Sequence, residues 1–169
     1  GGNIRLNHLE VIIMNRAKYD EIKRREGFVE VAPSTAYRPY STVRFVDDLV
    51  YVSGNVAFAG DKLMYKGRIG DNLTVEEGKR SAALAAINTL DLLDKAVGLE
   101  QVDYIVKMTG YLVCAEHIEE LPTIMNAASQ VFVDVFGEEA GKHARVALGM
   151  HTLPLGASSE IEFIAKLKK

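Results

Sequence analysis

One arginine and two glutamates stand out in the last quarter of the 169-residue chain, because each interrupts a run of alternating apolar residues. Arg145 lies within residues 144–150, and Glu160 and Glu162 lie within residues 158–167. The rigid fork of a guanidinium suits bidentate binding of a carboxylate. A positioned carboxyl group can handle water and protons. These residue types therefore permit carboxylate binding and hydrolysis, although from the pattern alone a solvated ion pair is the simpler interpretation.

The alternation predicts two strands that would hold these charges. Side chains on a strand alternate between two faces, so Arg145 faces away from the apolar side of the first strand, and both glutamates face away from that of the second. The segment 153–156 (Leu-Pro-Leu-Gly) breaks the pattern, because proline lacks a ladder donor and glycine tolerates turn dihedral angles. If the two strands are neighbours, the three charges line one shared surface while the apolar faces are buried.

Two amphipathic helices and further strands are predicted upstream. The clearest helix begins after Thr74, which forms a capping-box pattern with Glu77, and ends at Gly98. A second begins near Pro122 and ends at Gly137. The remaining predicted elements are a short charged helix over residues 19–26, strands over residues 42–46, 49–53 and 104–114, and a hairpin arm near residues 62–66. This order predicts an α+β fold, a single sheet with two helices packed on one face.

One face of such a sheet has no predicted cover. The strand over residues 104–114 carries apolar side chains at both parities, so both of its faces are expected to be at least partly buried. A one-layer helical cover leaves the second face without a partner inside the chain. The pattern therefore favours oligomerisation.

Composition limits the function classes. A net charge of −3 and a pI of about 5.8 argue against an extended phosphate-binding surface, and therefore against a nucleic-acid partner, but are compatible with one arginine that binds a small anion. The single cysteine, Cys114, cannot form an internal disulfide, which favours a reducing compartment. No apolar run has the length of a membrane span. A cytoplasmic protein without a membrane partner is expected.

The C-terminal segment resembles the signature of the Rid family, the reactive-intermediate imine/enamine deaminases, also called the endoribonuclease L-PSP family. The matching pieces are Ala144-Arg145, Leu153-Pro154 and Glu160-Ile161-Glu162. The long form of the family, with its N-terminal extension, resembles the chain from about Tyr19 onward. Its further echoes, in matching order and spacing, are Tyr51-Val-Ser-Gly54, Gly67-Arg-Ile-Gly70, Leu73-Thr-Val-Glu-Glu-Gly78, Asn126-Ala-Ala-Ser129, Phe136-Gly137 and His143-Ala-Arg145.

This resemblance implies a fold, an assembly and a reaction. It implies an N-terminal extension and helix over residues 1–27, followed by a Rid-like domain over residues 28–169. The domain is expected to have a chorismate-mutase-like fold and to assemble as a homotrimer with ligand sites in the clefts between subunits. The implied reaction is the hydrolytic deamination of 2-imino or 2-enamino acids to 2-oxo acids and ammonia, with neither a cofactor nor a metal.

The resemblance also implies which residues carry the two main roles. Arg145 aligns with the arginine that grips the substrate carboxylate, which reverses the preference for a surface ion pair. We assign the water-handling role to Glu162, the second glutamate of the pair, because it aligns with the glutamate of the family. Glu160 fits a solvated outward position better.

Five further positions resemble substrate-binding residues of the family. Tyr40, Ser53 and Gly54 are expected to line the cleft from the N-terminal side, and Asn126 is expected at a helix start. From sequence alone, a core-edge tyrosine and a strand-end glycine are about equally good interpretations of the first group, and Asn126 could simply satisfy nearby backbone groups. Ala147 stands where many deaminating members have cysteine. It keeps the function if that position acts through its backbone carbonyl.

Two rival functions belong to other classes. One is a trimer that binds small carboxylates without turning them over. The other is the ribonuclease activity named in the family, against which the acidic charge balance argues. A metal site is not expected, because the four histidines lack helical ligand spacing and His143 and His151 have no evident third ligand.

Overall fold

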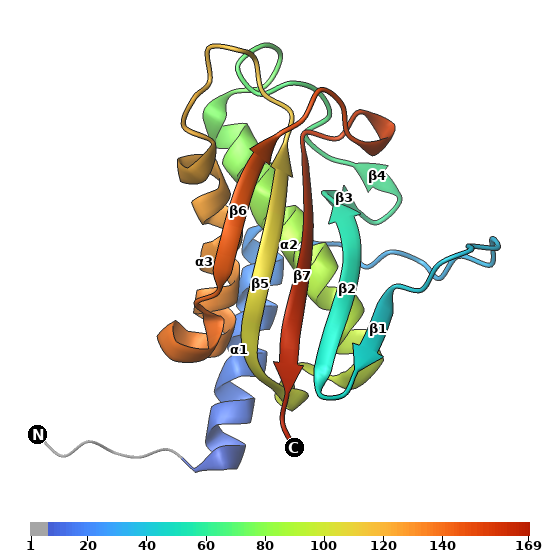
Figure 1. Ribbon diagram of the computed structural model, residues 1–169, viewed down its shortest axis with the longest axis vertical. Helices are drawn as coiled ribbons and strands as arrows, with labels where there is room; N and C mark the ends of the chain where they lie inside the picture. Colours follow the sequence, from blue (N-terminus) through green and yellow to red (C-terminus); the bar gives the residue numbers. More distant parts are fainter. Residues whose placement is uncertain (1–6) are drawn as a thin grey trace, which may run out of the picture.

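A computed structural model describes residues 7–169, apart from the side chain of Met14. The first six residues of the predicted extension lie outside this range. One five-stranded sheet stands in front of a layer of helices (Figure 1). Its elements in chain order are α1 (His8–Arg25), β1 (Val43–Val46), β2 (Leu49–Val56), β3 (Phe58–Ala59), β4 (Lys62–Leu63), α2 (Val75–Val97), η1 (Leu99–Gln101), β5 (Val102–Leu112), α3 (Leu121–Gly141), β6 (Ala144–Gly149), η2 (Pro154–Gly156) and β7 (Ser159–Leu167).

The sheet has the strand order β1-β2-β7-β5-β6. The central strand β7 pairs antiparallel with both β2 and β5, whereas the edge strand β6 runs parallel to β5. The two short strands β3 and β4 form the predicted hairpin arm. The α+β class is confirmed, but the two C-terminal strands are not neighbours, because β5 lies between them.

Helices α2 and α3 pack on one face of the sheet, as predicted, and a third helix, α1, packs against these two helices on the same side of the molecule (Figure 1). The additional helix is α1, predicted only as a short helix over residues 19–26. It begins at His8 because Asn7 and Glu10 form a complete capping box: the Asn7 side chain accepts from the Glu10 amide at 2.9 Å, and the Glu10 carboxylate accepts from the Asn7 amide at 2.8 Å. The N-terminal extension is therefore helical well before Tyr19.

Helix α1 contributes side chains to the hydrophobic core and also forms ion pairs at the surface of α2. Tyr19 and Ile22 are fully buried in the same apolar cluster as α2 and α3. On its polar side, Arg16 donates to both carboxylate oxygens of Asp94 on α2, at 2.6 and 2.8 Å. Such a bidentate pair adds geometric specificity to the apolar packing. Residues 8–25 of the predicted extension thus belong to the folded body of the protein.

Helices α2 and α3 follow the sequence prediction closely. The Thr74–Glu77 capping box is present in both directions, and α2 ends at Gly98. Helix α3 begins with Pro122 in its first turn, and Gly137, where the prediction ended it, has a positive φ of 87° that interrupts the helical path. At its centre, the buried ring of Phe132 lies 5.0 Å from that of Phe163 on β7. This contact packs α3 against the central strand of the sheet.

The face of the sheet opposite the helices, here called the open face, is uncovered in one chain. The prediction that the apolar side of β6 is buried is wrong for a single chain, since Val146, Leu148 and the following Met150 are 38–41% exposed. Their neighbours Arg145 and Ala147 point toward the helices instead. Tyr51 and Tyr104 add to the exposed apolar surface. The open face therefore carries a group of exposed apolar side chains.

Candidate functional site

A bulge in β2 places the first group of candidate residues. The register passes from Val52 opposite Phe163 to Asn55 opposite Ile161, so Ser53 and Gly54 together face only Glu162. Such a bulge bends the strand and redirects its side chains. The strand continues to Val56 and does not end at Gly54, as the sequence had indicated. The bulge therefore interrupts the pairing between β2 and β7 but does not end β2.

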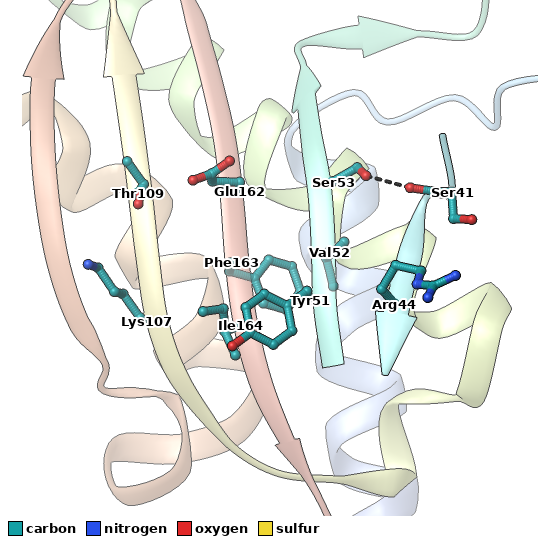
Figure 2. A pocket seen from close by; sticks show the side chains of 10 residues that line it. All are labelled: Ser41, Arg44, Tyr51, Val52, Ser53, Lys107, Thr109, Glu162, Phe163 and Ile164. Carbon is teal, nitrogen blue, oxygen red and sulfur yellow. Dashed lines mark hydrogen bonds between the residues drawn. The ribbon is translucent and has the colours of Figure 1, made fainter. Parts of the chain in front are cut away.

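A hollow of about 330 Å³ lies on the open face beside this bulge. Figure 2 shows Glu162 on β7 between Thr109 on β5 and Ser53 on β2. The Ser53 hydroxyl donates to the carbonyl oxygen of Ser41 at 2.7 Å, and the Ser53 amide donates to Thr42 at 2.9 Å. These bonds fix the segment before β1 against β2. The hollow is therefore lined by strands whose register is well determined.

The two glutamates of β7 lie in different environments. Glu160 is half-buried, and burial, followed by the nearby charge of Glu162, raises the pKa of its carboxyl group. Glu162 is exposed and accepts from the Tyr111 hydroxyl at 3.2 Å. Burial and Glu162 raise the pKa of that phenol. The burial of Glu160 and the raised pKa of its carboxyl group favour a proton-transfer role for this residue.

Gly54 allows the close approach of Glu160. A Cβ atom at Gly54 would lie 2.6 Å from Oε1 of Glu160, so a larger residue there would displace the carboxyl group. Gly54 and Ser53 also line a cavity of about 440 Å³ together with Tyr40. The predicted residues Tyr40, Ser53 and Gly54 thus come together. We call Ser53 and Gly54, with Glu160 and Glu162, the glutamate cluster; the cavity that Tyr40 shares with Ser53 and Gly54 is also lined by residues of α2.

The second group surrounds Arg145. Its Nη1 donates to Oδ1 of Asn126 at 2.8 Å and to Oγ of Ser129 at 3.1 Å, and its Nη2 donates to the carbonyl oxygen of Pro122 at 3.3 Å. All three partners are neutral and belong to the start of α3. Within residues 7–169, no carboxylate pairs with Arg145, and Nε–H and one N–H of Nη2 have no hydrogen-bond partner. Burial lowers the pKa of the guanidinium.

The half-buried guanidinium of Arg145 lies beside a cavity. Arg145, Asn126 and Ser129 line a cavity of about 310 Å³ with His143. We call these four residues the arginine cluster. Asn126, predicted as a substrate-binding residue, lies next to Arg145, and Ala147 lies on the same side of β6, partly buried against the core. A carboxylate here would meet two free N–H donors of one planar group.

The two clusters lie on opposite faces of the sheet. Arg145 pairs in register with Met108, which is buried under the helices, whereas Glu162 pairs with Thr109 on the open face. The surface shared by Arg145 and Glu162, expected for neighbouring strands, is therefore not present within one chain. The reason is the register across β5, since Arg145 is level with Met108 and Phe163, whereas Glu162 is level with Thr109. Each chain therefore carries the two clusters on separate faces of its sheet.

Ser129 and His143 are site residues that sequence reasoning did not assign. The motif Asn126-Ala-Ala-Ser129 places its two polar ends on one helix face, because residues three apart are neighbours on a helix. His143 precedes Arg145 by two residues in a strand-like stretch, so both share one side. These spacings could have indicated both. Their roles depend on contacts between α3 and β6 that local pattern does not reveal.

The described residues include neither a candidate metal site nor a membrane-spanning helix. Across residues 7–169, no three His, Cys, Asp or Glu side chains come together in a way that could hold a metal ion. None of the helices described is both long and apolar enough to cross a membrane.

Known proteins resemble this chain over most of its length. Residues 24–167 match the family described as "YjgF/chorismate mutase-like, putative endoribonuclease". Protein TCP17 of Trypanosoma cruzi is 32% identical over 137 residues, covering 80% of this chain and 84% of that protein. A RutC family protein of Aquifex aeolicus is 27% identical over 127 residues, covering 75% and 87%. The crystal structure of protein Atu1372 from Agrobacterium tumefaciens has a TM-score of 0.81 at 26% identity, covering 95% of this chain and 96% of that one. The chain therefore belongs to the Rid/YjgF family and has its chorismate-mutase-like fold.

Proposed function

We propose that this protein hydrolyses reactive 2-imino and 2-enamino acids to 2-oxo acids and ammonia. The observation that carries the proposal is Arg145, a half-buried guanidinium with neutral partners and two unused donors. A substrate carboxylate would satisfy these donors as a bidentate, charge-assisted pair. Membership of the Rid/YjgF family supports the same assignment.

The proposed reaction needs only water and a proton carrier. Water adds to the imine carbon while the imine nitrogen gains a proton. The carbinolamine then loses ammonia as its hydroxyl proton is removed, which leaves the 2-oxo acid. One carboxyl group can accept and return these protons through water. The glutamate cluster supplies it, and the raised pKa of Glu160 makes this residue, beside the sequence-assigned Glu162, the better candidate.

A complete site on this proposal needs two chains. The arginine and glutamate clusters lie on opposite faces of one sheet, so the arginine of one protomer would have to meet the glutamates of another. The exposed apolar residues of the open face favour such packing. We propose a homotrimer with the sites between subunits. Ala147 would contribute through its backbone carbonyl, and Tyr40 would close the cleft.

Imine turnover is the direct test of this function. An amino-acid oxidase acting on several amino acids would generate imines, and release of the 2-oxo acid would be followed with and without this protein. We expect the protein to accelerate release without added metal or cofactor. A protein that binds a 2-oxo acid in calorimetry but leaves the release rate unchanged would instead be a non-catalytic carboxylate-binding trimer. Cleavage of RNA under the same conditions, without imine turnover, would favour the ribonuclease activity.

Assembly can be tested independently of turnover. We expect sedimentation equilibrium at micromolar concentration to give three times the mass of the chain. Leu148→Glu places a charge on the open face, where the side chain is 41% exposed in one chain, so the variant should fold but dissociate. Leu9→Glu, on the exposed side of α1, is the matched control and should remain trimeric. A stable monomer of the parent protein would contradict both the trimer and the intersubunit site.

A further inference from the structure

A chain of hydrogen bonds leads from Arg145 to the end of α3. Arg145 donates through Nη1 to Oγ of Ser129 at 3.1 Å. The same oxygen lies 3.0 Å from Nε2 of His143, and Nδ1 of His143 lies 2.7 Å from the carbonyl oxygen of Gly141. The proposed deamination uses none of these partners directly. They nevertheless determine how the guanidinium is held.

The acceptors in this chain fix its protons. The carbonyl of Gly141 can only accept, so Nδ1 of His143 carries the hydrogen. In a neutral ring, Nε2 is then an acceptor, and the Ser129 hydroxyl donates to it. The Ser129 oxygen keeps its lone pairs for Arg145. Each donor thus meets an acceptor only if His143 is neutral and carries its proton on Nδ1.

The surroundings of His143 hold the ring in this orientation. The Phe132 ring meets it edge-on at a centroid distance of 5.4 Å. Charged groups facing its cavity are Arg145 and Lys142, and Lys142 is paired with Glu138. The side chains that α3 contributes to this cavity are uncharged. Burial lowers the pKa of His143, and the charge of Arg145 lowers it further, although the Gly141 carbonyl acts in the opposite direction.

We propose that His143 is a positioning residue, which acts through Ser129 to hold the Arg145 guanidinium for an anionic ligand and gains a proton more readily when that ligand binds. The proposal rests on the proposed function only in that Arg145 binds a carboxylate. It does not depend on deamination.

The sign of the coupling follows from charge. A bound carboxylate offsets the positive charge of Arg145, and so removes one cause that disfavours protonated His143. Because such coupling is reciprocal, protonation of His143 must strengthen carboxylate binding by the same factor. The ligand-bound protein should therefore have the higher His143 pKa, and acidification should tighten binding. Ser129 keeps its contact with Arg145 in both states, since its oxygen has two lone pairs.

The first test uses the protein without ligand. Nitrogen NMR of the histidine ring should show the Nδ1–H tautomer for His143. In Arg145→Gln, the titration midpoint of His143 should rise by about 0.5 to 1 pH unit, because one positive neighbour is removed. His8 and His117 serve as controls within the same spectra. An unchanged midpoint, or an Nε2–H tautomer, overturns the relay whether or not any ligand binds.

The second test measures pyruvate, a stable 2-oxo acid, by calorimetry, with pyruvamide as its uncharged control. As the pH falls from 8 through the His143 midpoints, the affinity of the parent should rise toward a limit of roughly threefold to tenfold, the factor that corresponds to the same midpoint shift. His143→Gln offers an amide oxygen to Ser129 but cannot gain a proton, so its affinity should not respond to pH. His143→Ala should bind more weakly than His143→Gln throughout this pH range.

Lys142→Gln is the matched control, because it removes a neighbouring charge outside the relay, and its pH dependence should follow the parent. If His143→Gln keeps the pH dependence of the parent, the relay is wrong. If pyruvate binds the parent at no pH, the proposed function fails instead, and the ligand-free measurement alone decides the relay.

Discussion

Arg145→Lys will lose most carboxylate binding and turnover although it keeps the positive charge. An ammonium group offers a point charge. The planar guanidinium donates to Asn126, Ser129 and Pro122 and still has two N–H groups free for a ligand. Loss of such a charge-assisted pair in a cleft should cost about 2–4 kcal/mol, or about thirtyfold to a thousandfold in kcat/KM. The measurement pairs imine turnover with pyruvate affinity.

Arg145→Ala provides the second arm of this experiment. It should lower affinity and turnover in parallel, with the trimer mass and thermal unfolding close to those of the parent, because Arg145 touches the start of α3 and not the apolar core. Arg44 lines the hollow on the open face and is the matched arginine for comparison. Arg44→Ala should bind pyruvate more tightly than Arg145→Ala does. Turnover and affinity at parent levels in Arg145→Ala would place the site elsewhere.

Local pattern predicted α2 almost completely and α1 only in part. The α2 stripe is readable because nearly every turn of the helix buries its apolar face against the sheet. In α1, by contrast, Val11 and Ile13 are exposed, so the apolar residues near its start do not mark one buried face. The Asn7–Glu10 cap was visible, but without a readable period it could not establish a helix. The start of α1 depends on packing against α2 and α3.

The strand β6 shows a different limit. Alternation identified which residues share a face, but not which face meets the core. In one chain the less apolar side, with Arg145 and Ala147, faces the helices, and the side with Val146 and Leu148 is exposed. Burial inferred from hydrophobicity does not distinguish the core of a chain from an interface between chains. The pattern indicated burial, and an assembly is where that burial would be realised.

The separation of Arg145 from Glu162 could not be predicted from the sequence for a related reason. The face to which each side chain points is set by the register of pairing, and both β6 and β7 pair with β5, which precedes them in the chain, and not with one another. A one-residue change in register reverses every side chain, so the faces depend on long-range pairing. The bulge at Ser53 and Gly54 adds another such change. The candidate residues were named by type, while their division into two clusters came only from the topology.

The second large effect is expected from Glu160→Gln. This variant keeps the size of the side chain but cannot carry a proton, so kcat should fall by about a hundredfold to ten-thousandfold while pyruvate affinity stays nearly unchanged. Glu162 lies two residues further along β7, on the same face. Glu162→Gln should have the smaller effect, because Glu162 is exposed whereas Glu160 is half-buried with a raised pKa. The paired variants therefore separate the sequence assignment from the one that burial favours.

The pH profile of kcat distinguishes the two glutamates further. Glu162 is one of the causes that raise the pKa of Glu160, so Glu162→Gln should lower that pKa and shift the acidic limb of the profile to lower pH. Gly54→Ala should also reduce turnover, since its Cβ would lie 2.6 Å from Oε1 of Glu160 and move the carboxyl group. A larger loss in Glu162→Gln than in Glu160→Gln, with the acidic limb unmoved, would return the water-handling role to Glu162. Equal parent-like rates in both would show that neither carboxyl group takes part, and that water reaches the imine from outside the glutamate cluster.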